Sequence, residues 1–112
     1  KVDNPGLPGD KHYGLAQKYM QKGAGGVLSF TLKAGREESA KLVEYLQLVS
    51  HLANVGDAKT LIIQPATTTH AQLSAEEQLA AGIEPGLFRV SVGIEHIDDI
   101  ISDFEQAFKK IL

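Results

Sequence analysis

One short stretch, LFRVSVGIEH at residues 87–96, constrains the fold strongly because its two faces differ. In a β-strand, successive side chains point to opposite faces of the sheet. One face of this strand is wholly apolar and is expected in the core: Phe88, Val90, Val92 and Ile94. The other face carries Arg89, followed by the small residues Ser91 and Gly93. We therefore expect a sheet with one face against the core and the other face free of helices.

The rest of the chain alternates between helix patterns and strand patterns. Helices are expected at 11–22, 36–53, 75–81 and from Ile97 to Ile111, with strands at 27–32, 60–64 and from Leu87 onward. Asp10 should cap the first helix, while Ser74 and Glu77 have the spacing of a capping box for the third. Together these elements predict an α/β domain of the two-layer α+β type, with a small, largely antiparallel sheet and helices packed on one face.

Composition excludes several classes of protein. The 112 residues, 43% hydrophobic and 22% charged, suit one globular domain with a single core. A net charge of −3, with both signs interspersed, gives no electrostatic footprint for nucleic acid or an anionic membrane. No apolar run approaches the roughly 20 residues that cross a bilayer. The chain has no cysteine, which fits a cytoplasmic location. Residues 1–10, with two prolines among glycines, are typical of a segment between elements, so we expect a fragment of a longer protein.

Most of the motifs that could carry chemistry favour structural interpretations. The four histidines lack a metal-site spacing such as H-E-x-x-H, so no metal site is predicted. The glycines of KGAGGVLSF (22–30) precede a strand, whereas a phosphate-binding loop needs them after a strand and before a helix. His70 follows three threonines in PATTTH. That pattern is typical of a turn with local hydrogen bonds, or of a functional loop.

Arg89 leaves two interpretations open. An unpaired buried guanidinium is costly, so Arg89 must meet a carboxylate, a phosphate or water. It could form a structural salt bridge or lie at a solvated edge, as most arginines do. It could instead bind the carboxylate of a ligand, for which the planar guanidinium is better suited than the ammonium of lysine.

Two longer segments, 51–83 and 87–108, resemble one enzyme family. HLANVGDAKTLIIQPATTTHAQLSAEEQLAAGI and LFRVSVGIEHIDDIISDFEQAF are similar to the C-terminal region of the pyridoxal-phosphate enzymes of cysteine and methionine metabolism. Within that family, SHLANVGDAKTL and EHIDDI look most like O-acetylhomoserine sulfhydrylases, and KGAGGVLSFTLKAG matches upstream. The resemblance implies that residues 1–112 form the C-terminal small domain of a fold-type I transferase. The large cofactor-binding domain would then lie outside this chain.

The resemblance also implies roles for individual residues. Arg89, in the R-x-S-x-G-x-E strand, would bind the α-carboxylate of the amino-acid substrate, and the small residues beside it would leave room for that substrate. Asn54 would make a second carboxylate contact; family lyases usually have serine there, which puts the lyase reactions in doubt. Thr69 would help orient the arginine, and His70 could line the same cleft.

For the complete enzyme, the resemblance implies pyridoxal 5'-phosphate as cofactor, with O-acetyl-L-homoserine and sulfide or methanethiol as substrates. The products would be homocysteine or methionine, and family members are usually homotetramers. The catalytic lysine and the cofactor-binding residues would lie upstream, so this fragment alone should contain no catalytic residue and no cofactor site. Two alternatives remain: a methionine or cystathionine γ-lyase or γ-synthase of the same family, and a non-catalytic amino-acid-binding regulatory module.

Overall fold

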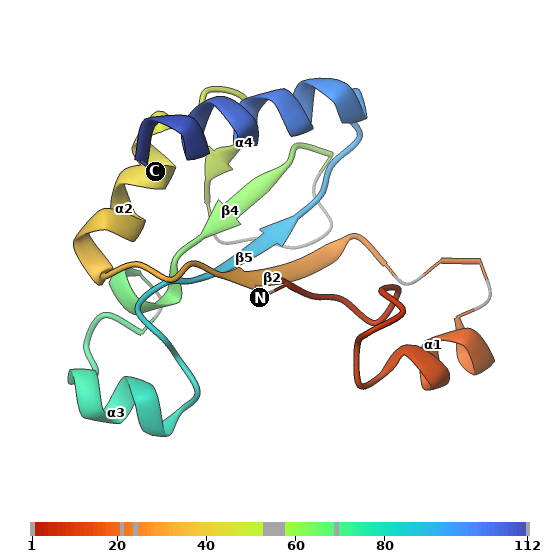
Figure 1. The fold of residues 1–112 in the computed structure, drawn as a ribbon, viewed down its shortest axis with the longest axis horizontal. Helices are drawn as coiled ribbons and strands as arrows, with labels where there is room; N and C mark the ends of the chain where they lie inside the picture. Colours follow the sequence, from red (N-terminus) through yellow and green to blue (C-terminus); the bar gives the residue numbers. More distant parts are fainter. Residues whose placement is uncertain (1, 21, 24, 53–57, 69, 112) are drawn as a thin grey trace.

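The fold is built on a mixed five-stranded sheet with strand order β1-β2-β5-β4-β3 (Figure 1). The computed structural model describes residues 2–20, 22–23, 25–52, 58–68 and 70–111. The strands are β1 (Val2–Asp3), β2 (Val27–Thr31), β3 (Ser50–His51), β4 (Leu61–Ile63) and β5 (Leu87–Ser91). Neighbouring strands pair antiparallel except β3 with β4. The expected largely antiparallel sheet is therefore confirmed, and the N-terminal segment contributes its edge strand β1.

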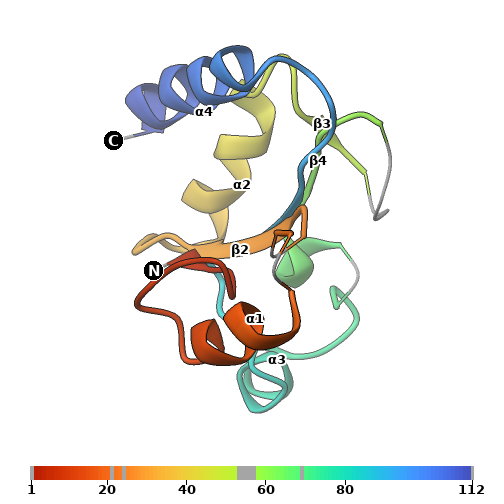
Figure 2. The same ribbon diagram turned by 90° about the vertical axis from the view of Figure 1, so that its right-hand side faces the viewer.

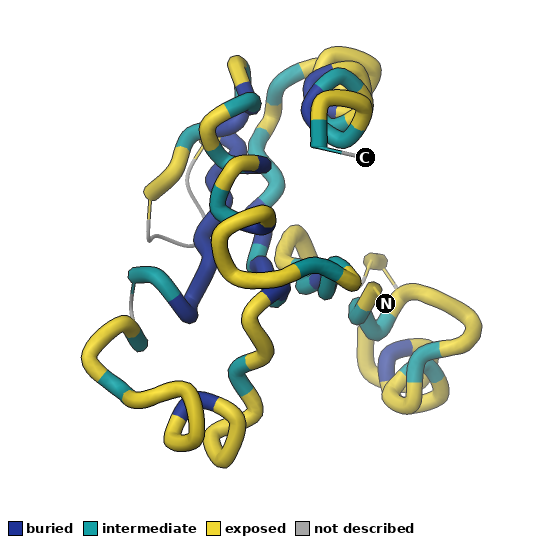
Figure 3. The backbone as a smooth tube through the Cα atoms, turned by 60° about the vertical axis from the view of Figure 1, so that its left-hand side comes forward, coloured by how far each residue is buried: buried dark blue, intermediate teal, exposed yellow. Residues whose placement is uncertain are grey.

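The helices fall into two groups. They are α1 (Tyr13–Tyr19), α2 (Arg36–Tyr45), the 3-10 turn η1 (Pro65–Thr67), α3 (Ala75–Ala80) and α4 (Ile97–Ile111). The pair α2 and α4 packs on one face of the sheet, as the half-polar strands predict (Figure 1). The short helices α1 and α3 lie on the other side of the sheet (Figure 2) and are largely exposed (Figure 3). Within the described residues, no helix is both long and apolar enough to span a membrane.

The core lies between the sheet and the α2–α4 layer. Phe30 on β2 and Phe88 on β5 are directly opposite each other in the register, and their rings stack with centroids 5.2 Å apart. Phe104 and Phe108 of α4 meet Phe30 edge-on, at centroid distances of 6.2 and 6.1 Å. Such aromatic pairs contribute roughly 0.5–1.5 kcal/mol beyond the area they bury. The apolar stripe of α4 therefore docks on the apolar face of the two central strands.

The expected helix 36–53 is too long, because α2 ends at Tyr45. Asp103 of α4 explains the early end: its carboxylate accepts hydrogen bonds from the backbone N–H groups of residues 47–49, at 2.8–2.9 Å. These N–H groups would otherwise donate to helical carbonyls four residues earlier. Residues 47–49, held by Asp103, lead directly into β3, and Leu46 and Val49 are still buried in the core.

Two further local predictions are wrong, and one is confirmed. Asp10 does not cap α1; its carboxylate accepts from the N–H groups of Asn4 and His12, and the helix begins only at Tyr13. Ile94 is 86% exposed, because β5 ends at Ser91 and the strand alternation stops there. The capping box of α3 forms as predicted, with both reciprocal hydrogen bonds present.

Candidate substrate-carboxylate site

Arg89 lies in the middle of the sheet, on the face opposite the α2–α4 layer. In the register it is directly opposite Ser29 on β2 and Ile63 on β4, while Asp3 on β1 is opposite Ser29. Residues directly opposite one another on paired strands share a face. Arg89 is half-buried and lines a hollow of about 290 Å³, together with Asp3, Ser29 and Pro65. The sheet therefore presents its one central guanidinium to an open hollow.

The guanidinium of Arg89 is not engaged in a structural salt bridge with any residue that the structure describes. It also makes no hydrogen bond within the described ranges. The chain's other arginine, Arg36, differs, since its Nη2 donates to the carbonyl of Ala66 at 3.0 Å. The described residues therefore do not support a structural salt bridge for Arg89, and a solvated arginine and a ligand-binding arginine both remain open.

The segment that follows β4 brings His70 close to this hollow. The N–H of His70 donates to the carbonyl of Pro65 at 2.9 Å, and Pro65 itself lines the Arg89 hollow. Gln78 of α3 holds the same segment from the other side. Its Nε2 donates to the carbonyls of Ala66 at 2.9 Å and of His70 at 2.7 Å. Gln78 is only 5% exposed, so these bonds lie in a nearly dry environment.

Gln64, at the end of β4, holds the start of the same segment. Its side chain is buried, donates to the carbonyl of Pro85 at 2.9 Å and accepts from the hydroxyl of Thr67 at 3.0 Å. The hydroxyl of Thr68 donates to the Gln64 carbonyl at 2.7 Å. Neither Gln64 nor Gln78 was predicted as a functional residue. One signal was available for Gln64, since an amide that ends the apolar run LII needs buried partners.

Glu95 ties the end of β5 to the start of β4. Its carboxylate accepts from the N–H of Thr60 at 2.8 Å and from the hydroxyl of Thr60 at 2.7 Å. The same hydroxyl accepts from the N–H of Gly93 at 2.8 Å. The backbone N–H of Thr60, and then its hydroxyl, hold the pKa of Glu95 below its usual range. We name these three residues the Glu95 clamp: Thr60, Gly93 and Glu95.

The small residues that follow Arg89 on its strand face, Ser91 and Gly93, are not among the residues that line the hollow. Ser91 is buried, and Gly93 packs against backbone. A Cβ atom at Gly93 would come 2.3 Å from the carbonyl oxygen of Ala58 and 2.5 Å from the carbonyl carbon of Lys59. Glycine is needed at this position because the 58–59 backbone approaches so closely.

Two of the predicted site residues, Asn54 and Thr69, lie outside the described residues. Among those that are described, no group of three or more His, Asp or Glu side chains is placed to hold a metal ion. Every described lysine is exposed to solvent.

Comparison with known proteins identifies the family of this chain. The sequence model of the "Cys/Met metabolism PLP-dependent enzyme" family matches residues 1–109. A homocysteine synthase from Schizosaccharomyces pombe is 57% identical over 96% of this chain, and an O-acetyl-L-homoserine sulfhydrylase from Leptospira meyeri is 50% identical over 98%. The chain spans about a quarter of the length of these relatives, 25% in both cases.

The fold is shared with solved enzymes as well. A cystathionine gamma synthase from Xanthomonas oryzae pv. oryzae, in complex with aminoacrylate and cysteine, superposes with a TM-score of 0.86 at 35% identity. The match covers 99% of this chain and 28% of that enzyme chain. On the family match, which spans nearly all of its residues, the chain belongs to the pyridoxal-phosphate-dependent enzymes of cysteine and methionine metabolism.

Proposed function

We propose that this chain is the part of an O-acetylhomoserine sulfhydrylase that binds the α-carboxylate of the substrate, and that Arg89 makes this contact. The observation that carries the proposal is the half-buried guanidinium, set in mid-sheet beside an open hollow and without an acidic partner among the described residues. A guanidinium binds a carboxylate through two parallel, charge-assisted hydrogen bonds. Asn54 and Thr69 are proposed as further contacts, on the resemblance alone.

For the complete enzyme we propose replacement of the acetate of O-acetyl-L-homoserine by sulfide or methanethiol. The names of the relatives support this choice: those at 57% and 50% identity are a homocysteine synthase and a sulfhydrylase, whereas the cystathionine gamma synthase is 35% identical. Pyridoxal phosphate supplies the electron sink for bond breaking at the substrate carbons. Arg89 contributes orientation, since a carboxylate held at two points fixes how the amino acid is presented to the cofactor.

The cofactor lysine is expected in the three quarters of the relatives' length that this chain does not span, because the resemblance implies that the large cofactor-binding domain lies upstream. This fragment alone is therefore proposed to lack both cofactor and activity. A homotetramer in the cytoplasm remains a prediction for the complete enzyme, to be tested by light scattering and cell fractionation.

The test is Arg89→Ala in the full-length protein. Truncating one partner of a hydrogen-bonded charge pair costs about 2–5 kcal/mol, so we expect the KM for O-acetylhomoserine to rise at least 30-fold. Cofactor absorbance and the melting temperature should stay close to those of the unmodified enzyme. Arg89→Lys keeps the charge but loses the two-point geometry, and an intermediate KM is expected. Lys41→Ala, which removes an exposed cation on α2, serves as the matched control.

An unchanged KM in Arg89→Ala would remove the carboxylate-binding role. Activity with methionine or cystathionine, and none with O-acetylhomoserine and sulfide, would favour a lyase or a synthase. A full-length protein with no cofactor absorbance, which nevertheless binds amino acids, would favour the regulatory module.

A further inference from the structure

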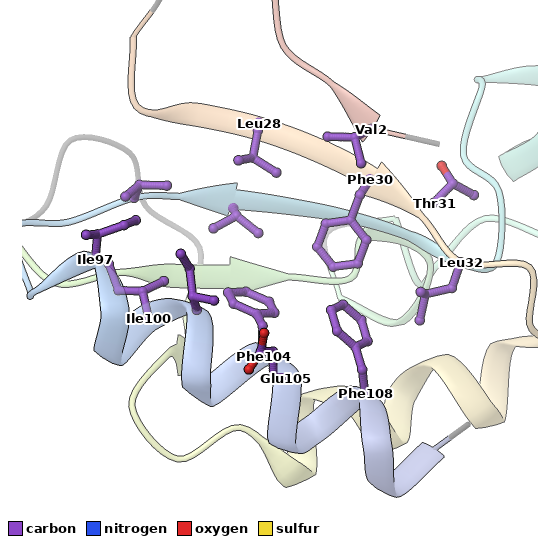
Figure 4. A pocket seen from close by; sticks show the side chains of 13 residues that line it. Val2, Leu28, Phe30, Thr31, Leu32, Ile97, Ile100, Phe104, Glu105 and Phe108 are labelled. Atoms are coloured by element: carbon purple, nitrogen blue, oxygen red, sulfur yellow. The ribbon is translucent and has the colours of Figure 1, made fainter. Parts of the chain in front are cut away.

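Asp3 lies on the same face of the sheet as Arg89, two strands away. Its neighbour Val2 lines an apolar groove beside α4, together with Phe30 of β2 (Figure 4). Side chains alternate between the two faces along a strand, so Asp3 and Ser29 project to the opposite face. In the register, Asp3 is opposite Ser29, and Ser29 is opposite Arg89. The three residues therefore form one row across β1, β2 and β5.

This row lines the Arg89 hollow of about 290 Å³, and all three of its residues are half-buried. The next residue of the row, Ile63 on β4, is buried and does not line the hollow. Apart from Pro65, every residue that lines the hollow belongs to β1, β2 or β5. The hollow therefore extends from Arg89 across β2 toward Asp3.

The charges of the hollow are unequally suited to different ligands. Among its described lining residues, Arg89 is the one cation and Asp3 the one anion. When the α-carboxylate of a substrate occupies Arg89, the rest of the ligand lies over Ser29 and apolar side chains, on the way to Asp3. A neutral acyl group suits this path. A second carboxylate would meet no further cation and one like charge, which is an effective way to reject a competing ligand.

Basic residues lie beyond Asp3, but outside this hollow. Lys11 and His12 line a second hollow, which adjoins the first at Asp3 and Ser29 and also includes Asp10. Both basic side chains are exposed to solvent, where salt screens their charge. Asp3 is therefore the charged group that a ligand extending from Arg89 meets within the hollow itself.

We propose that Asp3 makes the enzyme selective for homoserine esters with a neutral acyl group, because it repels an ester whose acyl group ends in a second carboxylate. The inference rests on the proposed function, in which Arg89 binds the α-carboxylate. In an extended succinyl ester the two carboxyl carbons are about 10 Å apart, at roughly 1.2 Å per bond. Two strand spacings of about 4.8 Å separate the backbones of β1 and β5 by a similar distance. The second carboxylate therefore comes close to Asp3, whereas an acetyl group is shorter and uncharged.

The experiment measures kcat/KM of the full-length enzyme with the acetyl, succinyl and butanoyl esters of L-homoserine. The butanoyl ester is similar in length to the succinyl ester but has no second charge, so it separates size from charge. Like charges about 4 Å apart repel by roughly 5-fold in water and by several hundred-fold in a partly dry site. In Asp3→Asn we therefore expect kcat/KM for the succinyl ester to rise roughly 10-fold or more. The values for the two neutral esters should stay within about 2-fold.

Two further measurements isolate the electrostatic effect. Asp98→Asn removes the same charge from an 81% exposed side chain on α4, outside the hollow, and is the matched control. Asp3→Lys reverses the charge and should favour the succinyl ester more than Asp3→Asn does. Raising the salt concentration from about 0.05 M to about 0.5 M shortens the Debye length. It should raise the ratio of succinyl to acetyl kcat/KM in the unmodified enzyme and leave that ratio unchanged in Asp3→Asn.

The proposal is overturned if Asp3→Asn leaves the succinyl-to-acetyl ratio unchanged, if it improves the butanoyl ester equally, or if Asp98→Asn has the same effect. An unmodified enzyme that uses the succinyl ester as well as the acetyl ester would also overturn it. Melting temperature and cofactor absorbance check that each variant is folded, and Asp3→Ser takes the place of an Asp3→Asn variant that is not. An unchanged ratio in an enzyme that uses the acetyl ester refutes this inference alone. An enzyme that uses neither ester refutes the proposed function, and this inference with it.

Discussion

Replacement of Asp103 by asparagine tests the idea that one carboxylate ends α2. Asp103 is 6% exposed; its Oδ1 accepts from the N–H of Gln47 and its Oδ2 from the N–H groups of Leu48 and Val49. Burial raises the pKa of Asp103, but the N–H donors of residues 47–49, together with the amide of Gln106, outweigh it and hold the pKa below its usual value. The ionised carboxylate is therefore the form that the fold requires.

The cost follows from the bonds lost. An asparagine at position 103 has one acceptor oxygen in place of two, so it loses either the Gln47 and Gln106 bonds or the Leu48 and Val49 bonds. Hydrogen bonds to a charged group contribute about 1.5–3 kcal/mol each, and neutral ones about 0.5–1.5 kcal/mol. Two bonds vanish and the other two become neutral, so we expect a loss of about 3 kcal/mol.

Hydrogen exchange in the full-length protein measures this loss directly. A local free-energy loss of about 3 kcal/mol corresponds to a fall of roughly 100-fold in the protection of the 47–49 amides. Asp98→Asn is the matched control, because that side chain lies at the start of the same helix and is 81% exposed. If Asp103→Asn protects these amides as well as the unmodified protein does, the carboxylate does not hold the turn and the reasoning fails.

The lowered pKa of Asp103 also predicts how the protection of the 47–49 amides depends on pH. The folded-state pKa of Asp103 is lowered, so its stabilisation is present above the unfolded value of about 3.9 and is lost as the pH falls below it. Protection of the 47–49 amides, corrected for the intrinsic exchange rate, should therefore fall between about pH 5 and pH 3 in the unmodified protein. It should be flatter over that range in Asp103→Asn.

Three further changes test other parts of the structure. Glu95→Gln should flatten the dependence of the melting temperature on pH below about 5. The pKa of Glu95 is lowered in the folded state, so the stability contributed by the Glu95 clamp is present above the unfolded pKa of about 4.3 and is lost as the pH falls. An unchanged pH profile would argue against the clamp. Gln78→Leu removes the donor to two backbone carbonyls in the segment after β4, so the free energy of unfolding of the full-length enzyme should fall by about 2 kcal/mol. The KM for O-acetylhomoserine should rise by a larger factor than kcat falls, whereas a pure stability effect would leave KM unchanged. Gly86→Ala puts a Cβ atom 2.2 Å from the carbonyl oxygen of Leu32 and should lower the melting temperature by several degrees, whereas Gly35→Ala, with open space around it, should not.

Local sequence patterns were sufficient where the deciding interactions are close in the sequence. The capping box of Ser74 and Glu77 formed because both partners are three residues apart. The helix from Ile97 to Ile111 formed because its apolar stripe, acidic start and basic end agree with one another. Strand β5 likewise followed its alternation, with Phe88 and Val90 in the core.

Predictions failed where a distant residue competes with a local preference. The pattern from Arg36 to Ala53 favours a continuous helix, and the interaction that ends it comes from Asp103, more than fifty residues away. Ile94 continues an alternation whose strand has already ended, since its N–H donates to the carbonyl of Ala58 in a loop. Such competition is invisible in a local window because the competing group approaches only in the folded state.

The sequence by itself determined the family, the half-polar sheet and Arg89 as the candidate ligand for a carboxylate, because these depend on residue identity and on a period of two along a strand. Only the tertiary structure decided that Arg89 faces an open hollow with no acidic partner among the described residues, and that Gly93 serves backbone packing. It also revealed the supporting roles of Gln64, Gln78 and Glu95. Each of these roles includes a contact between residues at least eight positions apart, which forms only when the strands and helices pack.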